Sequence, residues 1–127
     1  MRALTAATRQ RLREGVTKSA FGEDVLDFLE SVVQLAAHPL GEPSRSGDEA
    51  HEIAIADRVM QLLDAAVADV ASVANASVTL ARDPALLGAL FQSLDLLPVE
   101  HPAADSIALL VGMALSRLDE IEGDTDE

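Results

Sequence analysis

The chain has 127 residues, a length typical of one domain, and its nine Lys and Arg against 22 Asp and Glu give a net charge of −13. Hydrophobic residues make up 49% of the sequence, which is enough for a buried core and too much for a disordered chain. The absence of Cys excludes disulfides, thiolate metal sites and Cys nucleophiles. The negative charge opposes binding to nucleic-acid phosphates or anionic lipid over most of the surface.

The charge is unevenly distributed along the sequence. Five of the nine cationic residues lie in the first 18 positions, where only Glu14 opposes them, so this segment has a net charge of +4. From residue 19 onward, 21 carboxylates face four Arg, a net charge of −17. The cationic residues of the first segment are Arg2, Arg9, Arg11, Arg13 and Lys18.

The apolar residues recur with helical spacing, without sustained strand alternation. Residues 3–20 are predicted to form a first helix with few large apolar side chains, so residues 1–20 are expected to be a weakly anchored basic N-terminal helix. Arg2, Arg9 and Arg13 share one face of it. Residues 22–37 are predicted to form a second helix with a wide apolar stripe, and Pro39 prevents its continuation.

Residues 38–48 are rich in Pro, Gly and Ser and are predicted to form a loop within one domain. A long third helix follows, capped by Ser46 or Asp48, with an apolar pattern that continues to Ala81. A break near residues 72–77 is left open, because Asn and Ser compete for backbone hydrogen bonds. Asp64 and Asp69 fit the outer edge of this helix.

Asp83-Pro84 predicts the start of a fourth helix, which runs to about Leu97. Pro102 begins a fifth helix that is apolar on almost all sides, as expected for a central element or for half of a subunit interface. Residues 122–127 are expected to be a frayed acidic tail. The side chains of the fourth helix that are expected to be buried are Leu86, Leu87, Leu90, Phe91 and Leu94.

These elements predict an all-α fold, a single-domain bundle of about five helices spanning residues 1–127. The basic start lacks the apolar region of a signal peptide, and the longest apolar run, nine residues from Ile107 to Leu115, is half of what a membrane span needs. A cytoplasmic protein that does not contact membranes is therefore expected.

No catalytic or metal-binding pattern emerges. Asp48-Glu49-Ala50-His51 spells a helicase motif but stands without a phosphate-binding loop, and the Glu-x-x-His spacing of bundle metal sites is absent around His38, His51 and His101. These His are expected on the polar surface. A paired-carboxylate site in an apolar cleft has no clear candidate among Asp64, Asp69, Asp95 and Asp105. We expect no enzyme activity, cofactor or metal.

Two acidic stripes are the best candidates for partner binding, because almost no Lys or Arg lies one helical turn away to balance them. Unbalanced charge opposes compaction, and a basic partner would offset it, although added acidic residues also serve solubility. The stripes consist of Glu23, Asp27 and Glu30 in the second helix and of Asp57 and Asp64 in the third.

The basic face formed by Arg2, Arg9 and Arg13 has three possible targets. It can dock on the acidic body of its own chain or on a neighbouring subunit in a homodimer. It can also contact nucleic acid, but a charge of +4 without aromatic residues makes a weak footprint, so we expect no direct binding.

In charge and size the chain resembles small acidic helical inhibitors, such as immunity proteins and antitoxins. This resemblance implies a non-enzymatic protein whose acidic face occupies a basic surface on a partner protein. Acidic secretion chaperones and phage proteins that mimic DNA charge share the profile. The alternative is a self-assembling structural protein that buries its apolar fifth helix between subunits.

Overall fold

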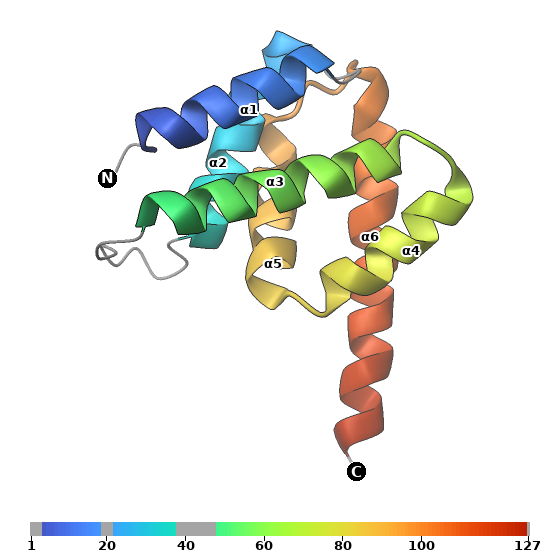
Figure 1. Cartoon of the computed structure of the whole chain (residues 1–127). Helices are drawn as coiled ribbons and strands as arrows, with labels where there is room; N and C mark the ends of the chain where they lie inside the picture. Colours follow the sequence, from blue (N-terminus) through green and yellow to red (C-terminus); the bar gives the residue numbers. More distant parts are fainter. Residues whose placement is uncertain (1–3, 19–21, 38–47, 127) are drawn as a thin grey trace.

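The computed structural model describes residues 4–18, 22–37 and 48–126, which fold into six α-helices and two short 3₁₀-helices without strands (Figure 1). The all-α prediction is confirmed, and the predicted count of five helices is wrong. The α-helices are α1 (Ala6–Lys18), α2 (Leu26–Ala37), α3 (Asp48–Ala66), α4 (Val70–Ala81), α5 (Pro84–Ser93) and α6 (Pro102–Asp126), and the 3₁₀-helices are η1 (Glu23–Val25) and η2 (Leu94–Leu96).

The sixth helix arises because the predicted long third helix is two helices, α3 and α4. The break lies at residues 67–69 rather than near 72–77, where the chain is continuously helical. Asp69 has extended backbone angles, and its side chain accepts a hydrogen bond from the Ser72 N–H at 2.7 Å. Asp69 is therefore the N-cap of α4 and not part of the outer edge of a third helix.

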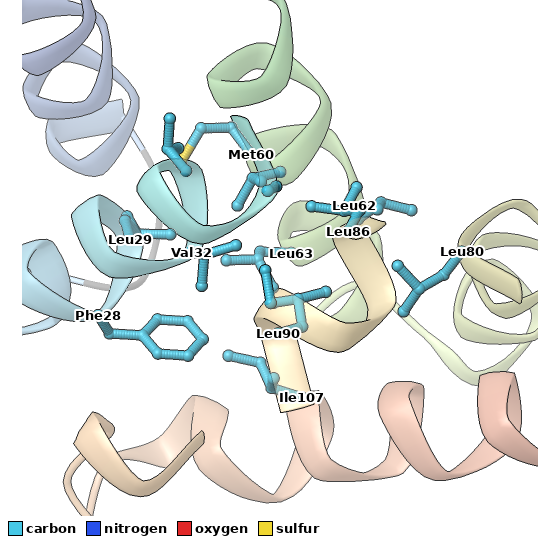
Figure 2. Packing of buried hydrophobic residues seen from close by; sticks show 14 of the residues in the cluster. Phe28, Leu29, Val32, Met60, Leu62, Leu63, Leu80, Leu86, Leu90 and Ile107 are labelled. Atoms are coloured by element: carbon cyan, nitrogen blue, oxygen red, sulfur yellow. The ribbon is translucent and has the colours of Figure 1, made fainter. Parts of the chain in front are cut away.

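The core is built from all six helices, with α2 packed along α5 and α4 packed along α6. Helix α3 crosses them and contacts α1, α2, α4 and α6 (Figure 1). Figure 2 shows the side chains that meet at the centre, with Phe28 and Val32 from α2, Leu63 from α3, Leu90 from α5 and Ile107 from α6. The apolar stripe predicted for residues 22–37 faces this core as expected.

Helix α5 begins as Asp83-Pro84 predicts. One Asp83 oxygen accepts a hydrogen bond from the Leu86 N–H at 3.3 Å, and the other accepts one from Arg58 of α3 at 2.5 Å. The prediction that Phe91 lies inside is wrong, because 58% of this residue is exposed, whereas Leu90 is fully buried.

Helix α6 is less buried than its composition predicts. Ile107, Leu110 and Ala114 are buried on one side, whereas Leu109 and Leu115 are 49% and 40% exposed on the other. Its C-terminal part extends beyond the other helices (Figure 1) and remains helical through Asp126, into the segment expected to be a frayed tail.

In the described part of the chain, no helix is both long and apolar enough to cross a membrane. Residues 38–47 of the predicted loop lie outside the described residues.

The cap at Asp69 predicts a pH-dependent contribution to stability. Hydrogen bonds from the backbone of Ser72 lower the pKa of Asp69, so the ionised carboxylate favours the folded chain. This stabilisation is complete above the ordinary Asp pKa of about 4 and is lost as the pH falls through the lowered pKa. Asp69→Ala should therefore lower the midpoint of thermal unfolding at pH 7, and the difference from the natural protein should shrink in acid.

Asp69→Asn keeps an acceptor for the Ser72 N–H and should retain much of the stability at pH 7. Asp119→Ala removes an exposed carboxylate of α6 and serves as the control. Equal effects of Asp69→Ala and Asp119→Ala, measured by circular dichroism, would show that the cap contributes nothing.

Candidate functional site

The N-terminus of α1 is bound to α3 through a buried carboxylate. Glu52 is 0% exposed, and its Oε1 accepts hydrogen bonds from the Thr5 N–H at 3.2 Å, the Thr5 hydroxyl at 3.2 Å and the Thr8 hydroxyl at 2.9 Å. Thr5 also accepts a hydrogen bond from the Thr8 N–H at 3.2 Å. Thr5 is therefore the N-cap of α1, and Glu52 holds the cap from a different helix.

This arrangement is a capping box assembled from two helices. In a capping box, a Glu three residues after the N-cap accepts a hydrogen bond from the N-cap backbone N–H. That position in α1 holds Thr8, and Glu52 of α3 supplies the carboxylate instead. Because the carboxylate also lies at the positive end of the α1 dipole, its charge is favourable there.

Two ion pairs extend the contact along both sides of α1. Arg9 Nε lies 3.4 Å from Glu30 Oε2 on α2, and Arg11 Nε lies 2.5 Å from Asp57 Oδ1 on α3. Residues two apart project to nearly opposite sides of a helix, so α1 lies between the two acidic stripes. The hydrogen bond with Asp57 raises the pKa of Arg11 further, and the guanidinium stays charged.

Of the three targets considered for the basic N-terminal segment, the ion pairs of Arg9 and Arg11 lie on its own chain. Arg13 is exposed on the same flank as Arg9, and Arg2 lies outside the described residues. Arg11 makes the shorter of these two ion pairs, although the basic face predicted from the sequence did not include it. Leu12 and Val16 are 0% and 2% exposed, so apolar packing supports the charge contacts.

Gly15 explains how closely α1 approaches α3. A Cβ atom at this position would lie 3.0 Å from Cε and Cγ of Met60. Beside this contact, a cavity of about 250 Å³ opens between the two helices. Polar and charged side chains line it together with Gly15 and Met60; the lining residues are Arg11, Glu14, Gly15, Lys18, Asp57, Met60, Gln61 and Asp64.

The cavity brings together Asp57 and Asp64, the two acidic residues predicted for the third helix. Partial desolvation raises the pKa of Asp64, whereas Asp57 accepts the hydrogen bond of Arg11. Acid–base catalysis by a carboxylate pair needs one member held in an apolar cleft. Here Asp64 is exposed and cationic side chains line the same cavity, so the arrangement favours ion pairing over proton transfer.

The acidic residues at the start of α2 are arranged differently. Glu23 and Asp27 are exposed on η1 and α2, whereas Glu30 is half-buried and pairs with Arg9. The structure therefore divides the predicted acidic face, because Glu30 and Asp57 are paired within the chain while Glu23 and Asp27 face solvent.

His101 is buried, contrary to the expectation of a surface His. It is 9% exposed, its Nδ1 accepts a hydrogen bond from the Ala103 N–H at 3.0 Å, and it thereby caps α6. Its Nε2 lies 3.6 Å from Asp24 Oδ1, which joins the start of α6 to η1. His51 is exposed and His38 lies outside the described residues. Among the described side chains, no group of three or more His, Asp or Glu could hold a metal ion.

Comparison with known proteins finds no similar protein. No family model matches the chain, and searches of curated proteins and of solved structures each give no match.

The Glu52 contact predicts a large loss of stability on substitution. Glu52→Ala leaves the half-buried Thr5 donors and the buried Thr8 hydroxyl without this acceptor and should lower the free energy of unfolding by about 3 kcal/mol. Thr8→Val removes one donor and should cost about 1.5 kcal/mol. In the double variant the two losses should not add, because both variants break the same hydrogen bond.

Glu49→Ala, one turn earlier on the exposed side of α3, is the matched control and should change stability by less than about 0.5 kcal/mol. Urea denaturation measures all four variants. Similar values for Glu52→Ala and Glu49→Ala would contradict the role given to Glu52.

Substitution of Asp64 should raise stability at pH 7, whereas substitution of Glu52 should lower it. A carboxyl with a raised pKa in the folded chain gives stability that is present below the unfolded pKa and is lost as the pH rises through the folded pKa. Asp64→Asn should therefore raise the urea midpoint slightly at pH 7, and the difference should vanish near pH 3. A variant less stable than the natural protein at pH 7 would show that the ionised carboxylate is favourable there.

Proposed function

We propose that the chain is a single-domain helical bundle that acts without catalysis, as an acidic binding protein for a basic partner protein. The observation that carries the proposal is the distribution of cations. No Lys or Arg occurs in residues 19–44 or 83–116, and these two stretches supply α2, α5 and most of α6. The carboxylates in these two stretches therefore have no Lys or Arg nearby in the sequence to balance their charge.

The intrachain ion pairs strengthen this argument. Arg9, Arg11 and Arg58 each contact a carboxylate of the chain, so three of the described cations are engaged internally. Glu23 and Asp27 stay exposed, and repulsion among such carboxylates would be relieved by a cationic partner. Electrostatic complementarity of this kind accelerates association and selects partners.

The most concrete form of this function is a cytoplasmic inhibitor, of the immunity or antitoxin type, that covers a basic functional surface on its target. A phage inhibitor that mimics DNA charge would use the same property, and a secretion chaperone would use it to hold a basic client. In each form the partner is a protein, and neither nucleic acid nor membrane is contacted directly.

Self-assembly is a second candidate, favoured by the exposed apolar side chains of α6. Leu109 and Leu115 are exposed at different angles around the helix, and the C-terminal part of the helix extends beyond the other helices (Figure 1). Sedimentation velocity separates this candidate from the first, since a protein that stays monomeric at high micromolar concentration does not assemble through α6.

The main proposal predicts salt-dependent binding. A partner captured from the native host and then purified should bind more weakly as ionic strength rises, because exposed charges are screened within about 8 Å at physiological salt. Glu23→Gln combined with Asp27→Asn should weaken binding and reduce its salt dependence. Isothermal titration calorimetry at several salt concentrations measures both effects.

Glu30→Gln combined with Asp57→Asn removes the same charge from side chains already paired with Arg, and is the matched control. A larger effect of this control, or an affinity that does not change with salt, would contradict the proposal.

A further inference from the structure

Three large apolar side chains are exposed between the last turn of α5 and the start of α6. Phe91, Leu96 and Val99 are 58%, 55% and 92% exposed, and we refer to these three residues as the η2 patch. Phe91 is the one exposed aromatic side chain in the described part of the chain, since Phe28 is 1% exposed. Three such side chains within nine residues make this segment a candidate interaction site.

The backbone beneath the patch is held in place. The Leu97 N–H donates to the Leu94 oxygen at 3.1 Å, and the His101 N–H donates to the Pro98 oxygen at 3.0 Å. Leu97 is 5% exposed and Leu94 packs against the core. The segment thus has buried anchors that alternate with the exposed residues, and the patch is preorganised for binding.

Carboxylates surround the patch. Asp95 and Glu100 are exposed within the same segment, and Asp24 reaches it through His101 at 3.6 Å with 64% of its own side chain exposed. Helix α2 runs antiparallel to α5 (Figure 1), and its acidic start lies near the η2 end, where Asp24 of η1 approaches His101. The nearest cations in sequence to the patch are Arg82 and Arg117.

We propose that the η2 patch is the contact site for a cationic amphipathic segment of the partner protein. Apolar side chains of that segment would cover Phe91, Leu96 and Val99, and its Lys or Arg would face Asp24, Asp95 and Glu100. Aromatic side chains at the centre of an interface carry much of its affinity, which gives Phe91 the main role.

The carboxylates near the η2 patch favour a cationic segment over other binding partners. A second copy of the chain would bring the same carboxylates against each other, and anionic lipid or nucleic acid would be repelled in the same way. The inference rests on the proposed function and deepens it, because it assigns the contact to one end of the molecule.

The probe is a fluorescein-labelled 18-residue peptide with Leu at helical i, i+3, i+4 and i+7 positions and Lys elsewhere, titrated with the protein and followed by anisotropy. Phe91→Ala and Val99→Ser should each weaken binding, Phe91→Ala by about tenfold or more. Asp24→Asn with Asp95→Asn and Glu100→Gln should reduce the salt dependence. Amide shifts on binding should centre on residues 91–100.

Val70→Ser is the matched control, because Val70 is 72% exposed at the start of α4 without being part of the patch. A peptide with Gln in place of Lys should bind more weakly, and equal binding by this peptide would overturn the charge argument. Salt-dependent binding of the Lys peptide that is unchanged in Phe91→Ala and Val99→Ser would overturn the site and leave the proposed function standing. No binding at low salt would overturn both.

Discussion

The buried carboxylate of Glu52 is the interaction on which the arrangement of the acidic and basic parts depends. It receives the backbone and hydroxyl donors at the start of α1, and thereby fixes the position of that helix on α3. An ionised side chain without exposure is costly unless hydrogen bonds compensate for lost hydration. The Thr5 and Thr8 donors offset part of that cost. Because they come from the start of α1, the contact is made only when α1 lies in this position on α3.

The position of α1 in turn divides the surface charge. With its start fixed, the helix presents Arg9 to α2 and Arg11 to α3, where each meets one carboxylate of the acidic stripes. The basic segment therefore neutralises part of the body of its own chain. Near the start of α2, the carboxylates of η1 and of the η2 segment stay exposed, in the same region as the exposed apolar residues 91–99. Binding by charge and binding by apolar contact are thus proposed for the same end of the molecule.

Local signals in the sequence were sufficient for some elements. Asp83 followed by Pro84 predicts the start of α5 because both residues act on their own helix. The Asp69 cap was missed because the apolar pattern continues across the short break at residues 67–69, where Asp69 takes an extended backbone. Glu52 shares a helix face with buried Ala56 and Val59, and an acidic residue in a core stripe was the signal that could have identified it.

The exposure of Phe91 could not be read from periodicity, because it depends on how α5 is rotated against α2. The anchoring of α1 by Glu52, a residue 44 positions away from Thr8, also depends on tertiary packing that periodicity does not predict.

Native-state hydrogen exchange tests the anchoring of α1 most directly. If Glu52 anchors α1, the amides of Leu12 and Val16 in α1 should open with nearly the same free energy as the amide of Leu63 in α3. Exchange of the α1 amides at close to the rate of an unfolded chain, with α3 still protected, would contradict it.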